Sequence, residues 1–189
     1  MKTNREQWYG LVKKRVANVD KLVFLDESGV NIDMIRRYGR AKGGKRVCDK
    51  SPVNTPTNTT LLSGIRINEV TARTSYRGGT TKGQFIKYIK ETLCPILKRG
   101  ECVVMDNLGV HHSPEVKEAI EKVGANVLYL PPYSPDMHPI EKMWSKIKAF
   151  LRKVRASDLS TLYQAIDNAF ASVSSDDCRG WFKSAGYSQ

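Results

Sequence analysis

Three acidic residues in this sequence follow a pattern that suits metal-dependent chemistry. Asp26 in KLVFLDES and Asp106 in ECVVMDN each end a short apolar run that predicts a buried strand. Glu141 opens an amphipathic helix after the turn LPPYSPDMHP. Carboxylate oxygens suit Mg²⁺ or Mn²⁺, and two such ions about 4 Å apart can hold the attacking and leaving oxygens of a phosphodiester. We therefore take these three residues as candidate catalytic and metal-binding residues, with two ions as cofactor.

The elements around these residues are predicted to bring them together. Residues 101–107 are predicted to form a strand, residues 113–123 a helix with Ser113 as N-cap and Pro114 first, and residues 126–132 another strand. A strand, a helix and a strand with short links make a right-handed parallel crossover. If the strands that end at Asp26 and Asp106 are parallel neighbours, both carboxylates emerge at one edge of the sheet.

The remaining periodicity predicts the fold class. KLVFLDES is apolar on both faces, which is typical of a strand inside a sheet. TTLLSGIRI and VTARTSYR predict an antiparallel hairpin, and residues 81–98 a helix that Pro95 kinks or ends. Further helices follow from Ile140 and Leu159, and a short one closes the chain. We expect an α/β protein with a mixed five-stranded sheet and helices on both faces. Residues 1–20 should form a lead-in helix, and residues 21–189 one main domain.

Each carboxylate also has a purely structural alternative. Asp26 and Asp106 could be turn formers, since carboxylates often follow strands. With His138 as N-cap and Pro139 as the first helical residue, Glu141 falls at the capping-box position. The two roles of Glu141 are compatible, because a helix N-terminus stabilises an ionised carboxylate.

Histidine and aromatic residues near these motifs carry weaker patterns. A zinc set of His111, His112 and His138 is disfavoured, because no short ligand spacing relates the first two to the third. Trp144 and Tyr133 are predicted to pack in the core and in the turn rather than to stack on nucleobases.

The net charge of +12 is concentrated in residues 33–50 and 142–155. Clustered basic charge indicates a polyanionic partner, most often nucleic acid, although a solvated basic face is the plainer alternative. The candidate DNA-binding residues are Arg36, Arg37, Arg40, Lys42, Lys45, Arg46, Lys142, Lys146, Lys148 and Arg152.

The cysteines and the apolar runs bear on the compartment. The four cysteines show no CxxC spacing, which argues against a zinc ribbon or a disulfide framework. The sequence contains neither a signal-peptide core nor an apolar run long enough to span a bilayer. We expect a cytoplasmic protein with no membrane partner.

LDES, VVMDNLGVHHS and YLPPYSPDMHPIEKMW together resemble the catalytic domain of bacterial insertion-sequence transposases in the mariner-like superfamily, the DDE transposases. The resemblance runs from about Lys21 to Tyr187. It implies a ribonuclease H-like fold, two divalent ions, and DNA strand cleavage followed by strand transfer at the ends of an insertion sequence. Asp26, Asp106 and Glu141 match the metal ligands of the family. Asn107 and His111 match the polar positions after the second Asp, expected to support the ligands or to contact phosphate.

The resemblance also implies partners: double-stranded DNA at the element ends and target, and a second copy of the chain on that DNA. The sequence departs from the family in two respects. The N-terminal helix-turn-helix region is absent, so it is either encoded as a separate polypeptide or lost from a truncated, inactive copy. His138 stands where the family usually has Asn, a better N-cap by about 1 kcal/mol.

Two alternatives to a transposase remain on sequence grounds. One is another ribonuclease H-like nuclease, such as a junction resolvase or a ribonuclease. The other is a catalytically silent DNA-binding or dimerisation remnant of a transposase.

Overall fold

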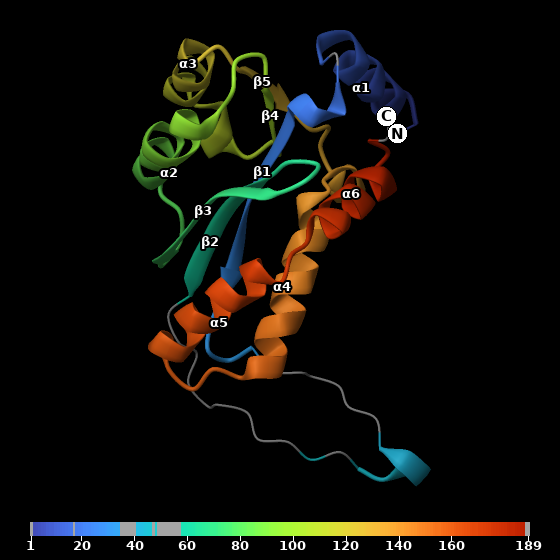
Figure 1. Ribbon diagram of the computed structural model, residues 1–189, viewed down its shortest axis with the longest axis vertical. Helices are drawn as coiled ribbons and strands as arrows, with labels where there is room; N and C mark the ends of the chain where they lie inside the picture. Colours follow the sequence, from blue (N-terminus) through green and yellow to red (C-terminus); the bar gives the residue numbers. More distant parts are fainter. Residues whose placement is uncertain (1, 17, 35–40, 47, 49–57, 188–189) are drawn as a thin grey trace.

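A five-stranded mixed sheet forms the centre of the computed structural model, with helices on both of its faces (Figure 1). The structure describes residues 2–16, 18–34, 41–46, 48 and 58–187. The strands are β1 (Leu22–Val30), β2 (Thr59–Ile65), β3 (Val70–Arg77), β4 (Cys102–Met105) and β5 (Asn126–Tyr129). The α-helices are α1 (Lys2–Arg15), α2 (Lys82–Tyr88), α3 (Pro114–Lys122), α4 (Ile140–Val154), α5 (Leu159–Ala171) and α6 (Ser175–Ser184).

The sheet has the strand order β3-β2-β1-β4-β5. β2 pairs antiparallel with both β1 and β3, whereas β4 pairs parallel with both β1 and β5. The predicted fold class, including the hairpin and the parallel neighbours β1 and β4, is confirmed.

The predicted place of Asp26 at the end of its strand is wrong. β1 pairs with β4 only as far as Phe24, but its ladder with β2 continues to Val30. The antiparallel partner thus keeps β1 extended beyond the point where β4 ends at Met105. Asp26 lies inside β1, just past the parallel pairing, and Asp106 directly follows β4. The two carboxylates still lie at the same edge of the sheet. Asp26 follows the last β1 residues that pair with β4, and Asp106 follows the last residue of β4.

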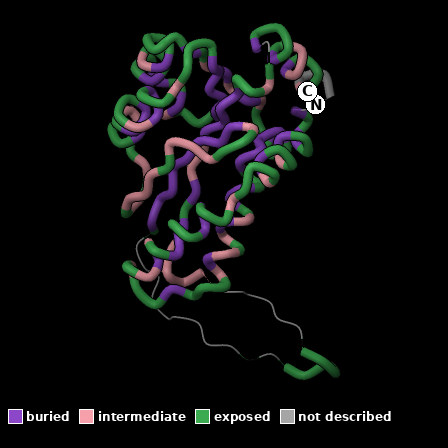
Figure 2. The backbone as a smooth tube through the Cα atoms, viewed as in Figure 1, coloured by how far each residue is buried: buried purple, intermediate pink, exposed green. Residues whose placement is uncertain are grey.

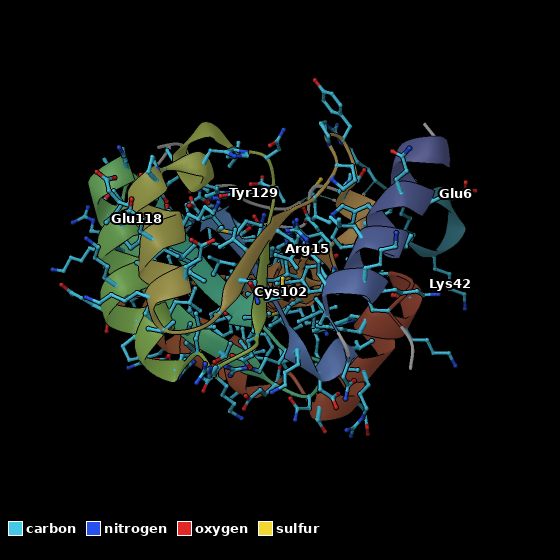
Figure 3. The ribbon with its side chains drawn as sticks, turned by 90° about the horizontal axis from the view of Figure 1, so that it is seen from above. Glu6, Arg15, Lys42, Cys102, Glu118 and Tyr129 are labelled. Atoms are coloured by element: carbon cyan, nitrogen blue, oxygen red, sulfur yellow. The ribbon has the colours of Figure 1, made fainter. Side chains whose placement is uncertain are left out.

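Alternate residues of β1 enter two separate cores, as expected for a strand with two apolar faces. Leu22 and Phe24 join the core beneath α1, α4, α5 and α6. Val23 and Leu25 join the core beneath α2 and α3. Figure 2 shows the resulting band of buried backbone along the central strands. In Figure 3, α3 with Glu118 and α1 with Arg15 lie on opposite sides of the strand that carries Cys102.

The predicted helix over residues 81–98 is irregular. Thr81 caps α2 through a capping box with Gln84, but after Tyr88 the chain widens into a π-helical turn over Ile89–Leu93. A 3-10 turn over Cys94–Ile96 then ends the segment. Pro95 explains the change, because its ring lacks an N–H and clashes with an α-helical carbonyl four residues earlier.

Ser113 holds the predicted N-cap position of α3 without making the expected cap bond. Its hydroxyl instead donates to Oε2 of Glu115, 2.6 Å away.

Both ends of the described chain hold the segment that precedes Glu141. The guanidinium of Arg5 donates two hydrogen bonds to Asp136, at 2.7 and 2.8 Å. The hydroxyl of Tyr187 donates to the carbonyl of Met137, 2.9 Å away. Figure 1 shows the two chain ends side by side at this place.

A buried ion pair joins the residue after β2 to the residue before β4. Arg66 donates to Glu101 through Nε, at 2.9 Å, and through Nη2, at 3.1 Å, and both residues are buried. Arg66 also contacts Glu69, and its Nη2 donates to the carbonyl of Ile96. Because every one of these acceptors is in place, the buried charge is well compensated.

In the described part of the chain, no helix combines the length and apolarity needed to cross a membrane. All four cysteines are free thiols, and Cys94, Cys102 and Cys178 are buried.

Candidate active site

The three predicted carboxylates line one cleft of about 460 Å³ at the stepped edge of the sheet. Asp26 comes from β1, Asp106 from the residue after β4, and Glu141 from the first turn of α4. The other wall is formed by the loop after β5. Its lining residues are Leu130, Pro131, Pro132, Tyr133, Ser134 and Pro135.

Asp26 is the most enclosed of the three carboxylates and is held by a tryptophan. The indole Nε1 of Trp144 donates to Oδ2 of Asp26, 3.0 Å away. Burial raises the pKa of Asp26 to about 7, and the negative charges of Glu141 and Asp106 add to this rise. The tryptophan was predicted only to pack in the core, so its hydrogen bond to Asp26 is an additional role.

Asp106 is held by His111. Oδ1 of Asp106 lies 2.6 Å from Nδ1 of His111 and accepts a hydrogen bond of 3.3 Å from the backbone N–H of Leu108. Burial by itself would raise the pKa of Asp106, but the contact with His111 outweighs it and lowers the pKa. Asp106 therefore stays ionised at neutral pH, whereas Asp26, with its pKa raised to about 7, is ionised only in part.

The imidazole of His111 is buried between two carboxylates. Its Nε2 lies 3.8 Å from Oε1 of Glu27, opposite the contact with Asp106, and its ring packs 4.6 Å from that of Phe85. Burial opposes protonation, but Asp106 and Glu27 together raise the pKa of His111 to about 9. An imidazolium is thus expected at neutral pH.

Glu27 is a site residue that the sequence interpretation missed. It follows Asp26 on β1 and so points to the opposite sheet face, towards α2. The hydroxyl of Thr80 donates to Oε2 of Glu27 at 2.5 Å, and the hydroxyl of Tyr76 lies 2.5 Å from the same threonine oxygen. The available clue was an acidic residue on the second apolar face of a buried strand, a position that needs a partner.

Glu141 stands in the first turn of α4, as predicted, and is exposed. The helix begins at Ile140, and Pro139 just before it already has helical dihedral angles. The carbonyl of His138 accepts from the backbone N–H of Glu141 at 3.1 Å, but the N-cap of the helix is Pro139, one residue later than predicted.

The side chain of His138 does not cap the helix. It is buried against Phe24, with ring centroids 5.4 Å apart, and its ring nitrogens make only a weak contact with the backbone of Leu25. Burial lowers its pKa to about 4, against the opposing charge of Asp106. The cost of His138 at this position therefore comes from burying a weakly hydrogen-bonded imidazole rather than from a weaker cap.

The three histidines do not converge on a zinc site. His112 is exposed, stacks on Tyr129 with centroids 4.0 Å apart, and lies 2.5 Å from Oδ1 of Asn107. Asn107 is therefore turned to His112, not to Asp106. Among the described residues, no three His, Cys, Asp or Glu side chains are gathered closely enough to hold an ion as they stand.

The donor set in the cleft nevertheless suits a divalent cation. It consists of hard carboxylate oxygens, which Mg²⁺ and Mn²⁺ prefer. The raised pKa of Asp26 reflects burial with Glu141 and Asp106 nearby, and a cation would offset that excess of negative charge. The chemistry of these residues therefore fits a divalent ion.

Residues 21–163 match the family model described as DDE superfamily endonuclease. The chain belongs to this family. The matched stretch contains all three carboxylates of the cleft, the whole sheet, and the helices α2, α3 and α4.

Relatives of this DDE superfamily member include transposases of nematodes. The chain is 29% identical over 75 residues to the transposable element Tc1 transposase of Caenorhabditis elegans. It is 34% identical over 68 residues to the Tcb1 transposase of Caenorhabditis briggsae. The matches cover 40% and 36% of this chain, but only 28% and 25% of those proteins.

Solved structures of the Mos1 transposase share the fold. The Mos1 mariner paired-end complex with Mn superposes with a TM-score of 0.76 at 17% identity, covering 98% of this chain and 58% of that chain. The catalytic domain of Mos1 gives a TM-score of 0.68 at 17% identity, with 98% and 87% covered. The fold is ribonuclease H-like, as predicted.

The predicted DNA-binding residues of this DDE superfamily member fall into two groups, one between β1 and β2 and the other on α4. The first group is only partly described by the structure. Arg36, Arg37 and Arg40 lie outside the described residues. Lys42, Lys45 and Arg46 are exposed, in or next to a short turn that stands apart from the sheet (Figure 1).

The basic residues of α4 are not equivalent. Lys142 and Lys146 lie one turn apart and face α6, where Lys142 donates to Ser184 at 2.5 Å and Lys146 pairs with Asp177. Lys148 and Arg152 are half-buried on the same helix. The charge of Lys146 is thus partly used within the fold.

The prediction that Tyr133 packs in the turn is wrong. Its side chain is 93% exposed. Its backbone has a φ of +56°, so the loop turns the ring outwards into solvent at the cleft instead of under the chain.

Proposed function

We propose that this chain is the catalytic domain of a transposase that cleaves DNA at the ends of an insertion sequence and joins the freed 3′ end to target DNA. The observation that carries the proposal is the lining of one cleft by Asp26, Asp106 and Glu141. Membership in the DDE superfamily endonucleases and the likeness to Mos1 support it.

Asp26, Asp106 and Glu141 would hold two Mg²⁺ or Mn²⁺ ions. Ions bound there supply activation of the attacking oxygen and charge stabilisation of the leaving oxygen of a phosphodiester. The Mos1 structures determined with Mn and with Mg support a divalent ion as the cofactor.

The residues around the carboxylates prepare them for this task. Trp144 orients Asp26 by donating to its Oδ2. His111 orients Asp106 and keeps it ionised. Glu141 lies at the N-terminus of α4, the end of the helix dipole that attracts negative charge.

Double-stranded DNA is the proposed partner, contacted by the exposed basic residues Lys42, Lys45 and Arg46 and by Lys148 and Arg152 of α4. We further propose a homodimer on DNA, recognition of the element ends by a separately encoded helix-turn-helix polypeptide, and a bacterial cytoplasmic setting. The nematode transposases and the Mos1 end complexes support the DNA partner.

A nicking assay on supercoiled plasmid with Mn²⁺ tests the activity. The natural chain should convert the plasmid to open circles. Asp26→Ala, Asp106→Ala and Glu141→Ala should each reduce the nicking rate by at least about 100-fold, because each removes a side chain that would bind the ions. Glu118→Ala is the matched control, because Glu118 is an exposed carboxylate on α3, away from the cleft. Equal nicking by all five proteins would refute the site assignment.

Strand transfer separates the transposase from its alternatives. A pre-cleaved end with a free 3′-hydroxyl should be joined to plasmid by the natural chain and not by Asp106→Ala. Nicking or branch cleavage without joining would favour a junction resolvase or ribonuclease. DNA binding without Mn²⁺-dependent nicking would indicate a silent remnant.

A further inference from the structure

Tyr133 is an aromatic residue at the active-site cleft whose ring is not used by the fold. It lines the same cleft as Asp26, Asp106 and Glu141, and 93% of its side chain is exposed. A single exposed aromatic residue is common on protein surfaces. The backbone that carries it supplies a second, independent observation.

The loop presents this ring in a strained and stiff conformation. A φ of +56° is costly for a residue with a bulky side chain, and such strain gathers at ligand-binding sites. Pro131, Pro132 and Pro135 restrict the chain around it. The buried Ser134 donates from its hydroxyl to the carbonyl of Pro132, 3.3 Å away. The backbone that carries the ring is therefore restricted before any ligand arrives.

The surroundings of the ring select a flat, uncharged ligand group. Leu108, which is 51% exposed, lines the same cleft together with the two prolines before Tyr133. An uncharged planar group beside the carboxylates of the cleft meets no charge repulsion. An aromatic face stacks on every nucleobase, whatever its sequence.

We propose that Tyr133 forms a stacking site for one unpaired nucleobase of the DNA strand, beside the phosphodiester that enters the cleft. The ligand class rests on the proposed function, which brings DNA into this cleft. A base can offer its full face to the ring only when it has left the duplex stack. The site therefore favours single-stranded or frayed DNA over a fully paired duplex.

Binding of two single-stranded probes tests the site without any cleavage. One probe is a fluorescent oligodeoxythymidylate, and the other has the same length and charge but carries abasic tetrahydrofuran units. Fluorescence anisotropy is measured without divalent ions for the natural chain, Tyr133→Asn and Tyr133→Phe. Asparagine tolerates positive φ, so Tyr133→Asn removes the ring without adding strain.

The natural chain should bind the thymidylate probe about 10-fold more tightly than Tyr133→Asn, the loss expected for one stacked base. Tyr133→Phe should bind like the natural chain, and all three should bind the abasic probe equally. The melting temperature of Tyr133→Asn should equal or exceed that of the natural chain.

Two results would overturn the stacking site: equal affinity of Tyr133→Asn and the natural chain for thymidylate, or an equal loss on both probes. A different result would contradict the proposed nuclease activity, namely no Mn²⁺-dependent nicking by the natural chain. Because the binding assay contains no divalent ion, either idea can fail alone.

Discussion

Nδ1 of the buried His111 lies 2.6 Å from Oδ1 of Asp106, so this candidate metal ligand is held by a charged partner inside the protein. Glu27, on the opposite face of β1 from Asp26, lies on the far side of the same imidazole. These contacts run from Glu27 through His111 to Asp106 and thus connect the core beneath α2 to the cleft.

Replacing His111 by Asn should weaken Mn²⁺ binding by about 10- to 100-fold, the usual effect of removing a group that orients a ligand. The apparent Mn²⁺ affinity is obtained from nicking rates over a range of Mn²⁺ concentrations. Glu27→Gln should weaken binding in the same direction, because it removes a charge that keeps His111 protonated. His112→Asn is the control, since the exposed His112 does not contact a carboxylate of the cleft. Equal losses in all three variants would contradict the positioning role of His111.

Trp144→Phe should raise the pKa of Asp26 above its already elevated value, because the indole N–H stabilises the carboxylate form. The unfolding free energy should fall by about 1 kcal/mol, the net value of one hydrogen bond. Carbon NMR of the Asp26 carboxyl, titrated in the absence of metal, measures the shift. An unchanged or lower pKa would show that the hydrogen bond does not set the charge of Asp26.

Glu101→Gln should destabilise the fold by about 3 kcal/mol, because it removes the buried carboxylate that pairs with Arg66 and leaves only the exposed Glu69 as its charge partner. Urea unfolding monitored by tryptophan fluorescence measures the loss. Lys117→Met removes the exposed pair of Lys117 with Glu121 and should cost no more than about 0.5 kcal/mol. Similar losses in the two variants would show that burial does not decide the strength of these pairs.

His138→Asn should gain stability over the natural chain as the pH falls. The pKa of His138 is about 4 in the folded protein, against an ordinary value near 6.5, so the unfolded chain binds the extra proton first. The contribution of His138 is therefore complete above pH 6.5 and is lost as the pH falls towards 4. Asparagine does not titrate, so the stability of the variant relative to the natural chain should rise by about 2 kcal/mol from pH 7 to pH 5. Urea unfolding at both pH values tests this, and a constant difference would contradict it.

The sheet and the convergence of the carboxylates were predictable because both follow from local periodicity and chain order. Two apolar faces predict a central strand, and the short crossover from β4 through α3 to β5 leaves one handedness. Asp106 and Glu141 then have to meet at one edge. The stepped edge was not predictable, because the length of β1 depends on its pairing with β2, a strand distant in sequence.

The contacts that tune the site were beyond sequence reasoning for the same reason. Nothing local relates Glu27 to His111, which meet only after β1 and the turn after β4 are in place. The exposure of Tyr133 follows from a positive φ that its residue type does not favour. A prediction from the backbone preferences of tyrosine assumes a negative φ and therefore packs the ring against the turn.

The step between β1 and β4 gives Asp26 and Asp106 different kinds of support. Asp26 belongs to a ladder of backbone hydrogen bonds that continues past it to Val30, whereas Asp106 begins a turn and is held by the side chain of His111. Glu141 stands exposed on the first turn of α4. The position of Asp26 is therefore fixed by the sheet itself, whereas that of Asp106 depends on a side-chain contact that a single substitution can remove.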